Sequence, residues 1–206
     1  MSKITLEPNA SGAGTFTLAA PNSNTNRTLN LPDASGNIIA ADASTGRFDS
    51  SNMPAGSVIQ VVQGATSTAT TTTSTSFSDT GLNASIFPNN ANNKILVSIS
   101  QPFFCSRERE FVDLFGLKLF RDSTEIVQIS EVLGIRAQVG GENGEAIFNG
   151  VINYSYIDFP SSTSELTYKT QFNNRAGGQN NSIVGVNIDA RGDSFLSTIT
   201  LMEIAG

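Results

Sequence analysis

The sequence contains no histidine and only one cysteine among its 206 residues. Histidine is the commonest general base and a frequent metal ligand, so its absence excludes Ser-His-Asp and Cys-His catalysis and two-histidine metal sites. A single cysteine excludes an intrachain disulfide. The apolar residues that precede Cys105 indicate a small buried hydrophobe rather than a reactive thiol. We therefore expect neither a cofactor nor a metal centre.

Charge is also scarce, because Asp, Glu, Lys and Arg make up 15% of the chain. The 12 basic and 18 acidic residues give a net charge of −6, and no basic cluster is long enough to follow a phosphate backbone. Nucleic acid is therefore not an expected partner. Thr, Ser, Asn and Gly are abundant instead, which predicts a neutral surface rich in hydroxyl and amide groups.

Long apolar runs are missing as well. No stretch approaches 18 consecutive apolar residues, so we expect no membrane insertion. Residues 1–8 carry no basic segment followed by an apolar one, so we expect no export through a leader of the chain's own.

The opening segment, residues 1–41, consists of short stretches that alternate apolar residues with Thr or Asn and are separated by Pro, Asn and Gly. This period is typical of half-buried strands, but no stretch exceeds about six residues. The segment also has too few large apolar side chains for a core of its own. We therefore expect other copies or a larger assembly to supply that core, through the stem residues Ile4, Leu6, Phe16, Leu18, Leu29 and Leu31.

Residues 42–55 are rich in Asp, Ser, Gly and Pro without a sustained period, which predicts a linker or neck. Residues 56–206 form the predicted head domain, with eight to ten strands and no convincing amphipathic helix. The Ser/Thr tract at 66–75 has two interpretations, a disordered linker or an edge strand, and its lack of Pro and charge favours the strand.

Strong alternation places Ile95, Val97 and Ile99 on one face of a strand that we expect to stop at Pro102. The last predicted strand, residues 195–204, is apolar on both faces, which indicates a central strand whose outer side is covered by another protein surface. The strand count predicts an all-β jelly-roll sandwich. The candidates for contact between copies are Tyr154, Tyr156, Leu196, Met202 and Ile204.

Other motifs favour structural interpretations. The mixed charges between residues 107 and 131 are more typical of a salt-bridge network than of an active site. The loop at 140–145 lacks the Gly-Lys-Ser/Thr ending of a phosphate loop, and a Ca²⁺ site there is the minority alternative. Arg191-Gly192-Asp193 fits a turn before the last strand. Two-carboxylate catalysis stays open, although nothing pairs two particular acids.

Amide-rich and aromatic loops at 149–156 and 173–182 offer stacking and hydrogen bonds to sugars. Core packing of their aromatic residues is the competing interpretation. The candidate receptor contacts are Asn143, Asn174 and Asn180.

Several segments carry a family resemblance. Residues 4–12, 16–21 and 26–36 resemble the amino-terminal segment of bacteriophage virion fibre proteins, and residues 56–63, 77–82, 93–97 and 197–204 resemble the carboxy-terminal head of tail-fibre and head-fibre proteins. The resemblance implies a homotrimeric appendage whose thin amino-terminal part fixes to a tail or capsid protein. It also implies a jelly-roll head, similar to tumour-necrosis-factor-like heads, that projects outward.

From these observations we expect a non-enzymatic virion protein, made in the host cytoplasm and located on the outside of the particle, whose head recognises host-surface glycan. Two alternatives remain. One is a capsid decoration or cement protein that stabilises the shell, and the other is a small polysaccharide depolymerase.

Overall fold

The computed structural model describes residues 11–12, 24, 53–108, 115–133 and 145–206. The chain divides into two compact units, Met1–Ile38 and Ile39–Gly206, and every described strand belongs to the second. The stem residues Ile4, Leu6, Phe16, Leu18, Leu29 and Leu31 lie outside the described residues. The stem and the proposed boundaries at 41 and 55 therefore stay predictions.

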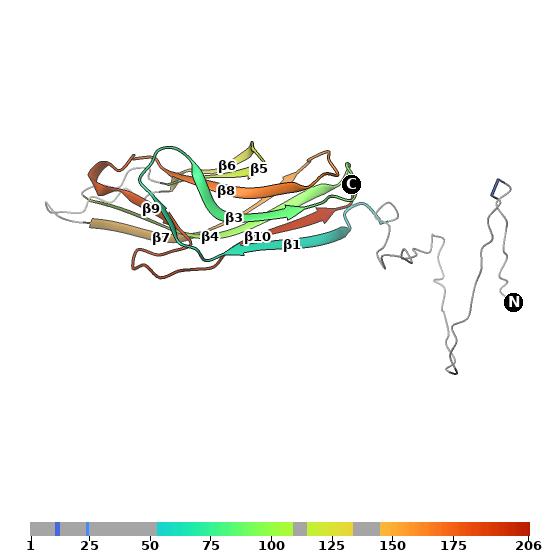
Figure 1. The fold of residues 1–206 in the computed structure, drawn as a ribbon, viewed down its shortest axis with the longest axis horizontal. Coiled ribbons are helices and arrows are strands. Elements are labelled where there is room, and N and C mark those ends of the chain that lie inside the picture. Colours follow the sequence, from blue (N-terminus) through green and yellow to red (C-terminus); the bar gives the residue numbers. More distant parts are fainter. Residues whose placement is uncertain (1–10, 13–23, 25–52, 109–114, 134–144) are drawn as a thin grey trace. The chain divides into compact units, whose positions relative to one another are not determined.

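Two antiparallel sheets pack face to face in the second unit (Figure 1). The first sheet contains β1 (Val58–Thr66), β10 (Ser197–Ile204), β4 (Lys94–Glu108) and β7 (Glu145–Asp158), with β9 (Ile183–Val186) and β2 (Thr70–Thr72) continuing it beside the second half of β4. The second sheet contains β3 (Ser78–Ile86), β8 (Leu166–Asn174), β5 (Phe115–Arg121) and β6 (Thr124–Leu133).

The strand pairs are nested along the chain, because β1 pairs with β10, β3 with β8, β4 with β7 and β5 with β6. Successive segments cross between the two sheets, which is the topology of a jelly roll. The described residues contain no α-helix, and their single helical element is the short 3₁₀ helix η2 (Gln179–Asn181). The predicted all-β jelly-roll sandwich is therefore confirmed.

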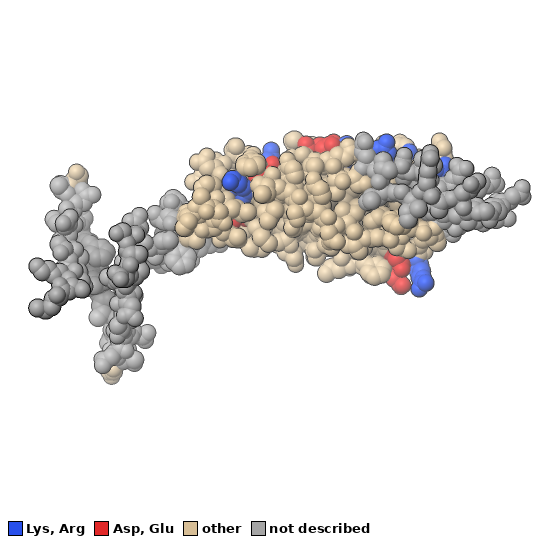
Figure 2. Space-filling model, turned by 180° about the vertical axis from the view of Figure 1, so that it is seen from behind, with Lys and Arg blue, Asp and Glu red and all other residues tan. Residues whose placement is uncertain are grey.

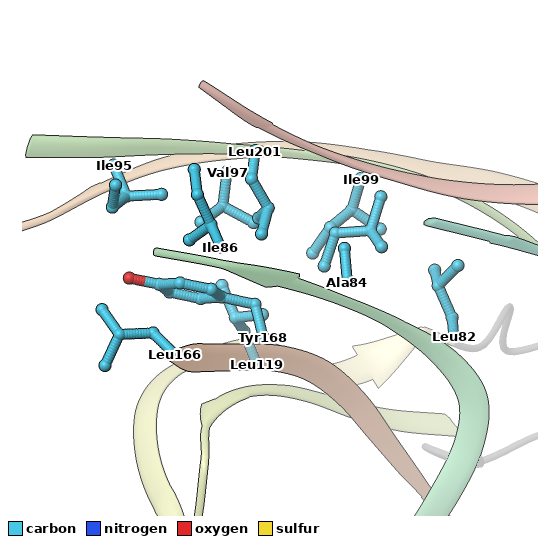
Figure 3. Packing of buried hydrophobic residues seen from close by; sticks show 11 residues of the cluster. Leu82, Ala84, Ile86, Ile95, Val97, Ile99, Leu119, Leu166, Tyr168 and Leu201 are labelled. Carbon is cyan, nitrogen blue, oxygen red and sulfur yellow. The ribbon is translucent and has the colours of Figure 1, made fainter. Parts of the chain in front are cut away.

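The core between the sheets consists of two apolar clusters. Figure 3 shows the first, in which Ile95, Val97 and Ile99 project from β4 toward Ile86 and Tyr168 of the second sheet. The predicted alternation of β4 is therefore confirmed over this half. The second cluster gathers phenylalanine rings, including Phe103 and Phe115, whose centroids lie 4.9 Å apart.

A layer of polar side chains separates the two clusters. Gln101 follows Ile99 on the inner face of β4, and Thr170 occupies the equivalent position on β8. Both are fully buried, and the Thr170 hydroxyl donates to Gln101 Oε1 at 3.0 Å. Thr170 also shares a 2.6 Å hydrogen bond with Thr80 of β3. Buried polar groups are costly when unpaired, so this layer favours one alignment of the two sheets.

Pro102 does not end its strand, contrary to the expectation from sequence. β4 continues to Glu108, because Pro102 lies where its partner strand changes. Pairing with β10 reaches Ser100, and pairing with β9 starts at Phe103. At this junction no N–H is required of Pro102, while its carbonyl accepts from the Asn187 N–H at 3.0 Å.

Two further expectations from the sequence differ in extent from the structure. Only part of the Ser/Thr tract is extended, in the end of β1 and in the three residues of β2. The last strand begins at Ser197 rather than at Phe195, because the Phe195 N–H bonds back to the Asn187 carbonyl at 2.9 Å in the preceding loop. β10 lies between β1 and β4, as predicted for a central strand.

Cys105 is fully buried, and burial raises the pKa of its thiol to about 12. Because the thiolate is the reactive form, we expect no modification of the folded protein by a thiol reagent at pH 8 within an hour. Unfolding in urea should release one reactive thiol per chain. Rapid labelling of the folded protein, followed by mass spectrometry, would contradict this assignment.

Candidate assembly surface

The outer face of the first sheet, which points away from the core, carries almost no charge. Burial alternates along β10, where Ile199 and Leu201 are buried while Met202 and Ile204 point outward. The pairing register places these next to the outward residues of the neighbouring strands. The outer face comprises Val61, Gln63 and Ala65 of β1, Thr198, Thr200, Met202 and Ile204 of β10, Lys94, Leu96, Ser98, Ser100 and Pro102 of β4, and Val151, Asn153, Ser155 and Ile157 of β7.

Exposed apolar side chains concentrate here. Val61 is 56% exposed, Val151 55% and Ile157 46%. Among the described residues, ten large hydrophobic side chains are exposed, and seven of them lie on this face or at its ends: Val58, Val61, Ile147, Val151, Ile157, Phe159 and Leu196. Exposed apolar side chains gathered on one face are typical of surfaces that contact another macromolecule.

The outer face of the second sheet is different, because charged pairs cross it. Lys118 Nζ lies 2.7 Å from the Glu125 carboxylate, and Lys169 Nζ lies 3.0 Å from that of Asp79. Partial burial opposes ionisation of Asp79, but hydrogen bonds from Gln171 and Lys169 hold its pKa below the usual value. In the view of Figure 2 the described charged side chains are few and lie near the borders of the surface. The second sheet therefore presents a solvated face, unlike the first.

The two apolar ends of the first sheet's outer face are separated by hydroxyl and amide groups. One register row contains Gln63, Thr200, Ser98 and Ser155, in which Gln63 Nε2 donates to Thr200 at 3.0 Å and the two serine hydroxyls lie 2.9 Å apart. The next row contains Ala65, Thr198, Ser100 and Asn153. A shallow depression of about 310 Å³ lies over both rows, and its outward side chains, Ser98, Ser100, Asn153, Ser155, Thr198 and Thr200, are here called the polar trough.

Within the described part of the chain β7 pairs on one side only, with β4, and its other edge, here called the free edge, adjoins this face. β7 has 14 residues, pairs with β4 without a register shift, and contains no Pro, Lys or Arg. Edge strands normally contain a proline, a lysine or a bulge, each of which hinders pairing with a strand of another molecule. Among the other described edges, β2 has three residues and β1, β3 and β6 carry register shifts.

The position of Pro102 shows which backbone N–H and C=O groups of β7 point toward its free edge. Because it has no N–H and its carbonyl bonds to Asn187, its pair with Val151 exchanges no hydrogen bond. Alternation then directs the N–H and C=O of Val151, Asn153 and Ser155 toward the free edge. The unprotected edge therefore lies beside an apolar face, and both are features that proteins normally cover.

A buried carboxylate holds together the end of the head where the chain enters it. Glu203 of β10 is fully buried and accepts from Gln60 Nε2, the Asn89 N–H and Asn93 Nδ2, each at 2.6 Å. The Gly56 N–H bonds to the Ala205 carbonyl at 2.9 Å. The start of β1, the loop before β4 and the end of the chain are therefore joined at this end.

Charged residues elsewhere form local structural contacts. Asp158 is buried and accepts from Arg121 Nη1 at 2.6 Å and from the Tyr168 hydroxyl at 2.7 Å. Burial, followed by the adjacent Asp158, raises the pKa of Tyr168. Of the network predicted between 107 and 131, Lys118 pairs with Glu125, while Arg121 pairs with Asp158 outside that range. Residues 109–114 lie outside the described residues.

The predicted contact residues divide into two groups. Met202 and Ile204 lie on the outer face, and Leu196, 62% exposed, lies just before β10. Tyr154 and Tyr156 stand opposite Ile99 and Val97, so they share the inner face and pack against the apolar clusters. Their half-burial follows from the position of β7 at the sheet edge, and they are not part of the outer face.

The receptor-loop prediction is wrong for Asn174. Its side chain is fully buried, donating to the Ser182 carbonyl at 2.9 Å and accepting from the Ala176 N–H at 2.9 Å, so it shapes the loop instead of facing solvent. Asn180 lies in η2, and Asn143 lies outside the described residues. Arg191, Gly192 and Asp193 are exposed in the predicted turn, where the Gly192 N–H bonds to the Asp189 carbonyl at 3.2 Å.

The described residues offer little that resembles a catalytic or metal centre. The depression on the outer face contains no carboxylate. No group of three or more Cys, Asp or Glu gathers as metal ligands in the described ranges. No helix in the described part of the chain is long and apolar enough to cross a membrane.

Comparisons with known proteins leave the chain without an assigned family. No protein-family model matches the sequence, and no curated protein matches it significantly. Among the described residues, the outer face of the first sheet and the β7 edge are the surface features that indicate a function.

Proposed function

We propose that this protein is a structural subunit of a bacteriophage virion, a homotrimeric tail or head fibre that attaches through its amino-terminal segment. Its jelly-roll head faces outward and recognises the host surface, with glycan as the expected ligand. The proposal joins the sequence resemblance to fibre proteins with the properties of the first sheet.

The observation that carries the proposal is the outer face of the first sheet, which is nearly uncharged and aliphatic toward both ends. Val61, Val151 and Ile157 are each about half exposed there, while the second sheet has charged pairs in the equivalent position. A neutral surface can meet identical copies of itself without like-charge repulsion. Self-association would remove both the aliphatic side chains and the β7 edge from water.

The ends of the head support the proposed orientation. The chain enters beside Ala205, through the hydrogen bond to Gly56. Thr66 of β1 pairs with Ser197 of β10, so the loop at 187–196 lies at the other end. A stem attached at the entry end leaves that other end free to meet a host.

Immunogold electron microscopy of purified particles tests the location. Antibody against the head should label the outside of the particle, at the tail or on the capsid. Absence of the chain from purified particles, measured by mass spectrometry, would contradict the proposal.

Adsorption to host cells distinguishes a fibre from a cement protein. Purified protein should bind the host saturably, and enzymatic removal of surface glycan should abolish binding. A cement protein should stabilise the shell against heat without saturable adsorption. Release of new reducing ends from the polysaccharide would favour the depolymerase alternative.

Deletion of residues 1–41 should leave the head folded but unable to join the particle, because the stem is the proposed attachment. Circular dichroism checks the fold of the shortened protein, and mass spectrometry of particles from a complemented infection checks incorporation. Normal incorporation would show that attachment does not depend on this segment.

A further inference from the structure

The polar trough lies in the middle of a face whose two ends are apolar. Val61, Met202, Leu96 and Ile157 form a row on one side of it, and Pro102 and Val151 lie on the other side. If association depended on apolar contact alone, aliphatic side chains in the middle would strengthen it. The polar centre therefore needs an explanation of its own.

Rows of outward side chains recur about every 7 Å along the strands, since each residue rises about 3.3 Å. A copy displaced by one row would bring aliphatic side chains, such as Leu96 or Ile157, against the hydroxyls of Ser98 and Ser155. Their mutual hydrogen bond uses only part of their donor and acceptor groups, and the rest would lose water without a replacement, which is unfavourable. The order of rows thus opposes displaced arrangements of two copies.

The depression leaves room for water when the face is covered. Its volume of about 310 Å³ is large enough for several water molecules. The trough hydroxyls and the Asn153 amide provide both donors and acceptors to such water. A hydrated centre is satisfied only when the trough of one copy lies over a matching polar surface of the next.

We propose that the polar trough fixes the register and the number of copies in which the heads associate, by remaining hydrated at the centre of an interface with apolar ends. The occupant of the outer face is a second copy of this chain. This inference rests on the proposed function, because it assumes that the heads associate through this face. A buried polar group in an apolar coiled-coil interface has a comparable effect, selecting register and oligomer number while weakening association.

The test replaces the bonded pair Ser98 and Ser155 by valine in the full-length chain. Native mass spectrometry across a dilution series measures stoichiometry and the midpoint of dissociation. We expect the wild type to give one oligomer. The double variant should associate more tightly, so that its midpoint of dissociation falls to a protein concentration at least about tenfold lower. It should also populate a second oligomeric species at about a tenth of the signal or more.

Matched controls separate polarity from side-chain volume. Ser98→Thr with Ser155→Thr keeps both hydroxyls and should retain the single wild-type oligomer. Thr198→Val with Thr200→Val is nearly isosteric and should repeat the effect of the serine-to-valine pair from the neighbouring strand. The two threonine-to-valine substitutions also provide the test if the serine-to-valine double variant fails to fold.

A trough without a role in register would give the same single oligomer and the same midpoint in both valine variants, and that result overturns the inference. A wild-type protein that is monomeric at micromolar concentration has a different meaning, since it overturns the proposed association through this face. The failures of the inference and of the proposed function are therefore distinguishable.

Discussion

Replacement of Glu203 by glutamine is expected to destabilise the head by about 3 kcal/mol, although the side chain keeps its size. The Glu203 carboxylate is fully buried and accepts from amide groups of Gln60, Asn89 and Asn93. A glutamine presents one NH₂ group to these donors, so at least one hydrogen bond is lost and two donors face each other. Urea unfolding followed by circular dichroism, at one fixed protein concentration, measures the difference.

Glu165→Gln is the matched control for this prediction. Glu165 is exposed in the segment before β8, so the same chemical change should alter the free energy of unfolding by less than about 0.5 kcal/mol. If Glu203→Gln were as stable as the control, the amide cage around Glu203 would not hold the entry end of the head together.

Replacement of Val61 by glutamate is expected to abolish association while the head stays folded. Val61 is 56% exposed on the outer face, and Met202 lies opposite it on β10. In an assembled protein the new carboxylate would be buried among aliphatic side chains, which is strongly unfavourable. We expect association to weaken at least about a hundredfold, equivalent to about 2.7 kcal/mol.

The control for this substitution lies on the other sheet. Asn83→Glu adds the same charge to the exposed side of β3, where Lys169 stands opposite. It should leave the oligomer intact in sedimentation velocity. Equal loss of association in both variants would mean that net charge, rather than the outer face, controls assembly, and the assignment of the face would be wrong.

Local alternation was enough to predict the class of the fold. Ile95, Val97 and Ile99 follow a period of two, and the last strand is apolar on both faces, so β4 and the central position of β10 follow from the sequence. Pro102 was misleading because a proline ends a strand only where an N–H is required. That requirement depends on strands almost a hundred residues further along the chain.

The details of the surface depended on register between distant strands. The polar trough combines residues of β4, β7 and β10, and their alignment cannot be derived from any one segment. Tyr154 and Tyr156 share a face with Phe148 and Ile152, a pattern that fits either the core or a contact between copies. Only pairing with β4 decides that these rings face inward.

Polar residues in the interior were the hardest to predict. Asn174 was expected to contact a receptor because it belongs to the amide-rich segment 173–182, but its amide bonds instead to Ser182 and Ala176 within the fold. The sequence around Glu203 does not indicate that its carboxylate is buried among amide donors, since Gln60 is 143 residues away. Such contacts are decided by tertiary packing rather than by local pattern.

Three copies of this chain are proposed to associate through the outer face of the first sheet. Size-exclusion chromatography with multi-angle light scattering, performed on the full-length protein at micromolar concentration, measures the mass of the assembled protein. We expect a single peak with three times the chain mass for the wild type, and a peak of one chain mass for Val61→Glu. A stable wild-type monomer, or a trimer unaffected by Val61→Glu, would contradict the proposed association.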